Sequence, residues 1–101
     1  AGFIVIVSLI SPYRSERKRA RDIRHELFRE IFIKASIDVC KKRDVKGLYA
    51  KAIRGEIKNF TGISSPYEEP EKPNLIINTF KEDVNESVEK LEKYIVREFS
   101  F

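Results

Sequence analysis

The stretch that decides the predicted fold is Phe3-Ile4-Val5-Ile6-Val7-Ser8-Leu9-Ile10. Nearly all of its residues are β-branched or aliphatic, and they are apolar at successive positions. Both faces of such a strand would be buried, which is typical of parallel sheets. The following Ser11-Pro12 would end the strand, because proline cannot donate to the hydrogen-bond ladder of a sheet. We therefore predict a buried strand over residues 3–10.

Helical and strand-like patterns alternate over the rest of the chain. We expect a helix over 15–27 with Ser15 as its N-cap, a strand over 30–34 and a short helix capped by Ser36. A helix over 47–54 closed by Gly55 and a long loop over 56–74 should follow. The chain should end with a strand over 75–79 and an amphipathic helix that begins with the capping-box pair Asp83 and Glu86. This order predicts an open α/β fold with a parallel sheet. Ligands of such sheets bind beyond the carboxyl ends of the strands, where Ile10–Arg14, Ser36 and Asn78–Thr79 are expected.

Composition limits the class of protein. With 101 residues, 42% of them hydrophobic and 36% charged, the chain is long enough for one globular domain and too apolar for a wholly disordered one. The run at residues 3–10 is too short to span a bilayer, and no secretion signal precedes it. A single cysteine excludes an internal disulfide, so we expect a cytoplasmic protein with no membrane segment. Because the chain contains no methionine and enters a strand at once, we also expect it to be part of a longer protein.

Charge is distributed unevenly. Residues 1–50 carry 12 Lys and Arg against 6 Asp and Glu, whereas residues 51–101 carry 8 against 10. The densest basic run lies between Arg14 and Arg29. It is open to three interpretations: a solvated helix face with i,i+4 ion pairs, a surface that binds a small anion, or a surface that binds nucleic acid.

Two stretches combine cations, glycines and aromatic rings, namely Arg43–Tyr49 and Gly55–Glu68. A phosphate-bearing ligand needs charges for its phosphates, glycine for close approach of the backbone, and a ring on which a base can stack. A purely structural loop is the alternative. His25 and Cys40 have no catalytic signature around them, so we expect a surface histidine and a small buried cysteine, and metal-ligand spacing is absent.

These segments resemble the C-terminal half of adenylylsulfate kinases. The resemblance is carried by Ile10–Arg14, Val39–Tyr49 and Gly55–Glu68, and it runs in register from Ala1 to about Tyr94. It implies an enzyme, a phosphotransferase of sulfate assimilation that moves the γ-phosphoryl of ATP to the 3′-hydroxyl of adenosine 5′-phosphosulfate (APS), giving 3′-phosphoadenosine 5′-phosphosulfate. It also implies a P-loop kinase fold with a five-stranded parallel sheet. Three of these strands would lie in residues 1–101, the C-terminal part of one kinase domain, with lid and substrate loop at about 41–74.

The resemblance also implies roles for individual residues. The substrate-binding positions would be Ile10, Ser11, Lys46, Asn59 and Phe60. Ser11 further matches a position described as a phosphoserine, although direct in-line transfer needs no covalent step. Asn59 stands where the family usually has glycine, a mild change because asparagine tolerates positive φ.

Arg43 would lie in the ATP lid, and its structural alternative is a salt bridge with Asp44. The chain contains no Gly-x-x-x-x-Gly-Lys-Ser/Thr motif, so the site for the ATP phosphates and Mg²⁺ is expected in an N-terminal part outside these residues. We therefore expect no metal site in this chain and no catalysis by the 101 residues alone.

The resemblance implies APS and ATP as ligands, and it raises a homodimer and a fusion to a sulfate adenylyltransferase as further partners. Two alternative functions stay open. The chain could belong to another P-loop nucleotide kinase, or it could be a non-catalytic basic module that binds nucleic acid through residues 14–29, with affinity that falls steeply with salt.

Overall fold

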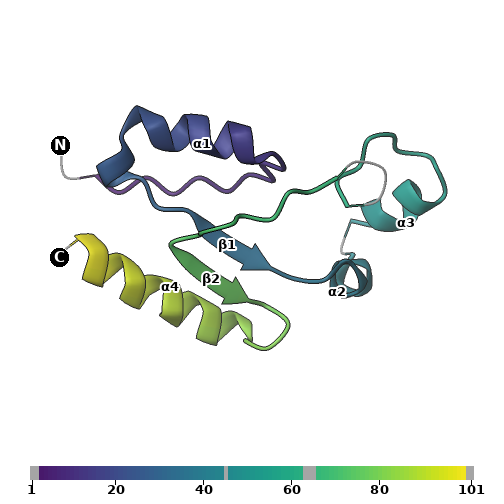
Figure 1. The fold of residues 1–101 in the computed structure, drawn as a ribbon. Helices are drawn as coiled ribbons and strands as arrows, with labels where there is room; N and C mark the ends of the chain where they lie inside the picture. The colour runs from purple at the N-terminus through teal and green to yellow at the C-terminus, as the bar shows by residue number, and fades with distance from the viewer. Residues whose placement is uncertain (1–2, 45, 63–65, 100–101) are drawn as a thin grey trace.

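The structure is a computed structural model that describes residues 3–44, 46–62 and 66–99. Its elements in chain order are α1 (Arg14–Ile23), the 3₁₀ turn η1 (His25–Leu27), β1 (Ile31–Lys34), α2 (Ile37–Arg43), α3 (Leu48–Ile53), β2 (Leu75–Asn78) and α4 (Val84–Phe99). Figure 1 shows α1 and α4 on either side of the two strands, with α2 and α3 gathered beyond the arrowheads. This arrangement confirms the predicted α/β class.

The sheet is small and parallel. Ile31 of β1 pairs with Leu75 of β2, and the register continues to Lys34 opposite Asn78. The core lies between this sheet and α4, where Ile77 and Tyr94 retain only 2% and 5% of their accessible surface. Strand and helix therefore bury each other's apolar faces, as the periodicity of the sequence predicts.

The predicted strand over residues 3–10 is not present in the structure. The segment runs extended beside α1 without sheet hydrogen bonds, so the sheet of the described residues has two strands (Figure 1). Phe3 is 86% exposed and Leu9 75% exposed. A cavity of about 600 Å³, lined by residues 3–9, β1 and α4, separates the segment from the edge of β1. The sequence has strong strand propensity, but a strand exists only when a neighbour accepts its backbone hydrogen bonds.

The start of α1 is also corrected. The helix begins at Arg14, one residue before the predicted start, and Ser15 is therefore not its N-cap. The N-cap is Tyr13, whose side chain makes no capping hydrogen bond. The backbone N–H of Arg14 donates instead to Glu68 Oε1 at 2.8 Å. A carboxylate from a distant loop thus satisfies one of the donors that a local cap would have bound.

Three other helix boundaries confirm their local signals, whereas the helix predicted to reach residue 27 ends at Ile23, before η1. The Ser36 hydroxyl accepts from Val39 N at 3.2 Å, and Asp83 Oδ1 accepts from Glu86 N at 2.8 Å. Gly55, just after α3, has φ +78°, a left-handed conformation that favours glycine. These caps need only neighbouring residues, which is why the sequence predicts them.

Two smaller expectations have different outcomes. His25 lies exposed in η1, as predicted, whereas Cys40 is half-buried in α2 rather than fully buried. Over the described ranges of the chain, no helix combines the length and apolarity that crossing a membrane requires.

Candidate functional site

The carboxyl ends of the two strands are joined to α2 through Thr79. Its backbone N–H and its hydroxyl both donate to Lys34 O, each at 3.0 Å, and so tie the residue after β2 to the end of β1. Arg43, in the last turn of α2, donates to the Thr79 hydroxyl at 3.1 Å and to the Thr79 carbonyl at 2.6 Å. The predicted lid arginine is therefore held at the sheet edge where ligands of parallel sheets bind.

The joint between α2 and α3 depends on Asp44. Its backbone N–H donates to Cys40 O, which ends α2, while its carboxylate accepts from the N–H groups of Tyr49 and Ala50 at 3.0 and 3.1 Å. The predicted alternative of an Arg43–Asp44 salt bridge is wrong, because each side chain has these other partners. One carboxylate thus compensates two donors of the first turn of α3.

Lys46 and Gly47 form the turn before α3. Gly47 has φ +67°, and its N–H donates to Asp44 O at 3.0 Å. Lys46 is exposed beside it. The predicted substrate cation is therefore an exposed residue directly before the left-handed Gly47 and α3.

The predicted substrate loop is packed against α3. The rings of Tyr49 and Phe60 meet edge to face, with centroids 4.9 Å apart and planes at 78°. Asn59 has φ +55°, which confirms that asparagine takes the left-handed conformation at this position. Burial raises the pKa of Tyr49, and its hydrogen bond with Cys40 adds to this shift. The phenol of Tyr49 in α3 is thus partly buried and hydrogen-bonded to Cys40 in α2.

The Ser11 turn lies at the same end of the molecule. Figure 1 shows the turn between residues 3–10 and α1 on the side to which the arrowheads of β1 and β2 point. Ser11 has φ +42°, an uncommon value for a residue with a Cβ. The next carbonyl, that of Pro12, accepts from Glu68 N at 2.8 Å. The end of the substrate loop is thus fastened to the segment that carries Ile10 and Ser11.

The predicted site residues Ile10, Lys46 and Phe60 lie outside the two cavities that the described residues line next to α1 and next to β1. The described residues form a cavity of about 470 Å³ between α1 and residues 70–72, besides the one next to β1. The structure groups Lys46, Asn59 and Phe60 around α3, and Ile10 with Ser11 at the neighbouring turn. The contact of both groups with one ligand stays a prediction.

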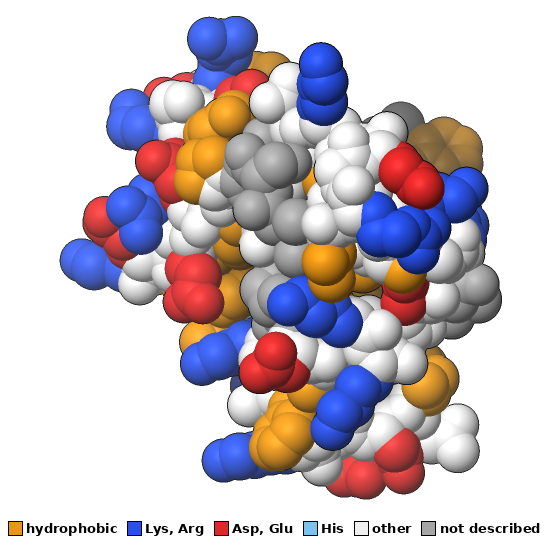
Figure 2. Space-filling view, turned by 90° about the vertical axis from the view of Figure 1, so that its right-hand side faces the viewer, with side chains coloured by type: hydrophobic (Ala, Val, Ile, Leu, Met, Phe, Trp, Pro, Cys, Tyr) orange, Lys and Arg blue, Asp and Glu red, His pale blue; other side chains and the backbone are white. Residues whose placement is uncertain are grey.

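The basic run 14–29 is largely paired with acidic side chains. Lys18 and Asp22 form the expected i,i+4 pair at 3.1 Å, and Arg29 pairs with Glu98 at 3.1 Å. Figure 2 views the end of the molecule that carries α2 and α3, where blue cations are interspersed with red carboxylates and orange apolar side chains. The ion pairs of the run 14–29 favour the interpretation of a solvated, salt-bridged face over a continuous surface for a polyanion.

The described residues contain no group of three or more His, Cys, Asp or Glu side chains placed to hold a metal ion. Arg43 and Lys46 are two of the exposed cations at this end, and cations of this kind contact phosphate or sulfate groups. The donors present therefore suit a nucleotide's anionic groups and do not by themselves form a Mg²⁺ site.

Sequence reasoning missed two residues of this region. Thr79 is expected at the sheet edge because it ends the predicted strand 75–79, but no pattern in the sequence indicates that it binds Arg43. Arg17 is one of many cations in the run 14–29. Nothing in the neighbouring sequence indicates that its side chain is only 11% exposed. Both act through contacts across the fold, for which a single sequence carries no signal.

Comparisons with known proteins agree with this architecture. A family model described as adenylylsulphate kinase matches residues 1–78. The adenylyl-sulfate kinase of Prochlorococcus marinus is 53% identical over 92 residues, which are 90% of this chain and 46% of the relative. The bifunctional enzyme NodQ of Rhizobium sp. strain N33 is 49% identical over 94% of this chain and 15% of its own length.

A solved structure gives the same result. The APS kinase CysC of Mycobacterium tuberculosis, in complex with AMPPNP and APS, superposes with a TM-score of 0.69 at 37% identity over 83% of this chain and 50% of that one. The chain spans about half the length of the adenylyl-sulfate kinase relative that it matches. With more than half of its residues matched by the family model, the chain belongs to the adenylylsulphate kinase family.

Proposed function

We propose that the protein to which this chain belongs is an adenylylsulfate kinase. It transfers the γ-phosphoryl of ATP to the 3′-hydroxyl of APS. Residues 1–101 supply the C-terminal part of the kinase domain, with the lid and the substrate loop at about 41–74. The chain covers about half of its kinase relatives, so the activity belongs to the whole protein.

One observation carries the proposal: the edge-to-face contact of Tyr49 and Phe60 joins the lid segment to the substrate loop beyond the carboxyl edge of the sheet. Arg43 anchors the same lid segment to Thr79. In a phosphoryl transfer that depends on positioning and on electrostatic stabilisation, a rigid lid of this kind orders the two nucleotides and excludes water.

Each residue has a role suited to its chemistry. Lys46 contacts the anionic phosphosulfate, Phe60 stacks on the adenine of APS, and Asn59 shapes the loop that presents Phe60. Ile10 and Ser11 line the substrate pocket, and Arg43 covers the nucleotide that donates the phosphoryl group. Mg²⁺ bound with ATP neutralises the charge that develops on the phosphates. Because transfer is direct, Ser11 carries no phosphoryl group after incubation with ATP, which intact-mass measurement checks.

The test is ATP-dependent phosphorylation of APS by the complete encoded protein. Phe60→Ala is expected to raise KM for APS at least about fivefold, the effect of losing a stacked base worth about 1–3 kcal/mol. Lys58→Ala, which changes an exposed residue two positions away, is the matched control. Competition by adenosine monophosphate as strong as by APS would favour another nucleotide kinase, and absence of turnover with APS would refute the proposal.

The 101-residue polypeptide assayed by itself is expected to give no turnover, because it lacks a phosphate-binding glycine loop with its lysine. A second protein domain is supported by the NodQ relative, a bifunctional enzyme of which this chain covers 15%. Reading the encoded sequence tests a fusion to a sulfate adenylyltransferase, and native mass measurement tests a homodimer.

A further inference from the structure

We propose that Arg17 is a positioning residue of the substrate site. Its guanidinium fixes the backbone of Ser11 and ties it to the end of the substrate loop at Glu68. The inference rests on the proposed function, because Ser11 and the substrate loop are assigned to APS there. It adds a residue that has no predicted role and that lies on α1, outside the lid and the loop.

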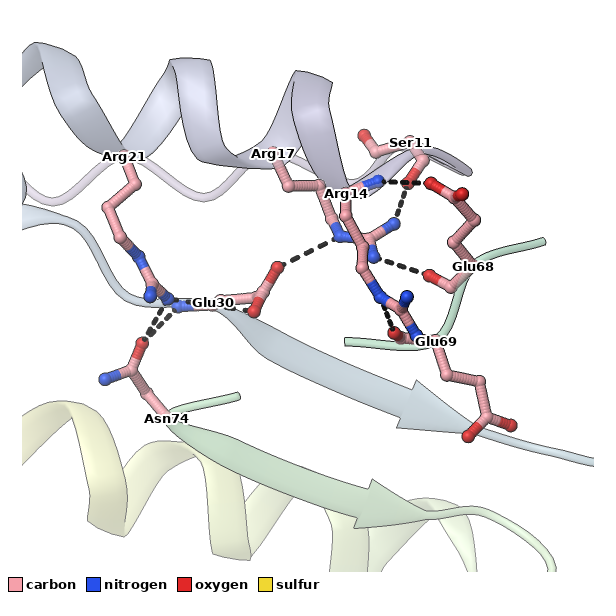
Figure 3. Close-up of polar contacts among 8 residues, drawn as sticks. All are labelled: Ser11, Arg14, Arg17, Arg21, Glu30, Glu68, Glu69 and Asn74. Atoms are coloured by element: carbon pink, nitrogen blue, oxygen red, sulfur yellow. Dashed lines mark hydrogen bonds and ion pairs between the residues drawn. The ribbon is translucent and has the colours of Figure 1, made fainter. Parts of the chain in front are cut away.

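Three segments of the chain converge on this one side chain. Arg17 Nη1 donates to Ser11 O at 2.5 Å, Nη2 donates to Glu68 O at 2.5 Å, and Nε lies 3.1 Å from Glu30 Oε2. Figure 3 shows the guanidinium between these groups, with Arg14 beside it. Ser11 is six residues before Arg17 and Glu68 is 51 residues after it. A planar guanidinium has fixed donor directions, so it sets the relative positions of its three partners.

The surroundings hold the guanidinium in one place. Only 11% of the Arg17 side chain and 15% of the Glu30 side chain are exposed, so their ion pair is shielded from water. The guanidinium also lies 5.7 Å from the centre of the Tyr67 ring. Tyr67 directly precedes Glu68. Arg17 therefore contacts the loop at two neighbouring points, the Tyr67 ring and the Glu68 carbonyl.

Ser11 needs such a restraint because its φ of +42° is costly for a residue with a Cβ. The bond from Arg17 fixes the carbonyl that follows this dihedral, and the bond from Glu68 N fixes the carbonyl of Pro12. Ile10 and Ser11 belong to one predicted substrate segment, and the stretch Gly55–Glu68, which contains Asn59 and Phe60, ends at Glu68. Arg17 therefore joins the two segments that the proposed function assigns to APS.

The experiment compares Arg17→Lys with Arg21→Lys in the complete protein. A lysine at position 17 keeps the charge beside Glu30, but its single ammonium cannot span three acceptors in a fixed plane. We expect KM for APS to rise about tenfold or more, because small displacements of binding groups cost that much, with KM for ATP changed less than about twofold. Arg21 lies on the same helix and also pairs with Glu30, but its other contacts are with Asn74 and Phe28 and not with Ser11 or Glu68. Arg21→Lys should leave both KM values unchanged even where the melting temperature falls.

Amide hydrogen exchange gives a readout that does not depend on activity. The Glu68 amide hydrogen is bonded to Pro12 O at 2.8 Å. Its exchange rate should rise in Arg17→Lys and stay at the wild-type value in Arg21→Lys. An active protein in which Arg17→Lys leaves KM for APS unchanged, or raises both KM values equally, overturns the inference. An unaltered Glu68 amide in Arg17→Lys also overturns it. A wild-type protein that does not phosphorylate APS refutes the proposed function instead.

Discussion

Replacing Thr79 by valine tests how the lid is anchored to the sheet. Valine keeps the β-branched shape and the carbonyl that accepts from Arg43 Nη2, but it lacks the hydroxyl. Two hydrogen bonds are lost, the one from Arg43 Nη1 at 3.1 Å and the one to Lys34 O at 3.0 Å. Lys34 O keeps a partner in the backbone N–H of residue 79, so no buried acceptor is left unpaired.

The magnitude follows from these contacts. A hydrogen bond contributes a net of about 0.5–1.5 kcal/mol, and the exposure of Arg43 places its bond at the lower end. We expect the free energy of unfolding to fall by about 1–2 kcal/mol. The remaining bond from Arg43 to the carbonyl cannot fix the guanidinium plane by itself, so α2 is held less firmly. KM for ATP should rise about threefold to tenfold, because the lid is then ordered in a smaller fraction of molecules.

The assay is urea unfolding together with steady-state kinetics of the complete protein, with Thr79→Ser as the control. Serine keeps the hydroxyl and loses only a methyl group, so it should retain most of the stability and a KM for ATP close to wild type. If Thr79→Val matched the wild type in both measurements, or if Thr79→Ser were as impaired as Thr79→Val, the hydroxyl would not be the anchor.

Three further changes test the rest of the site. Asp44→Ala removes the acceptor of two N–H groups at the start of α3 and should cost about 1–2 kcal/mol of unfolding free energy in urea, with Asp44→Asn less affected. Asn59→Val forces a β-branched residue to φ +55° and should lower the free energy of unfolding by about 1–2 kcal/mol in the same assay. Glycine adopts this φ without strain, so a loss of more than about 1 kcal/mol in Asn59→Gly would contradict this account. Burial, with the nearby Glu98 carboxylate adding to it, raises the pKa of Tyr94 above its usual 10.0. The folded protein thus binds this proton more tightly than the unfolded chain does. The free energy of unfolding should therefore fall as the pH rises above about 10, and it should fall less steeply in Tyr94→Phe. Urea unfolding between about pH 9 and pH 11 checks both slopes.

Short-range patterns account for the parts of the fold that the sequence predicts. Short apolar runs place β1 and β2, and apolar residues at helical spacing place α4. Ser36, Gly55 and Asp83 mark helix ends through bonds to residues within a few positions. The lid and the loop around Phe60 are likewise recognised from their motifs. The contact between them, the Tyr49–Phe60 pair, appears only in the folded chain.

Long-range contacts account for what the sequence does not predict. Glu68, 54 residues after Arg14, accepts from the first N–H of α1 in place of the cap expected from Ser15. Arg43 binds Thr79 and not Asp44, which was its structural alternative. Arg17 differs from the neighbouring arginines only in the three acceptors that the fold brings to it.

By itself, the sequence determined the strand propensity of residues 3–10, the helical faces and the cationic, glycine-containing loops, because backbone preference and side-chain chemistry are local properties. The tertiary structure alone decided that β1 and β2 pair while residues 3–10 stay unpaired, and that the Arg17 guanidinium joins Ser11 to Glu68. Sheet ladders and ion pairs need two partners, and the distance between partners is fixed only when the whole chain is folded.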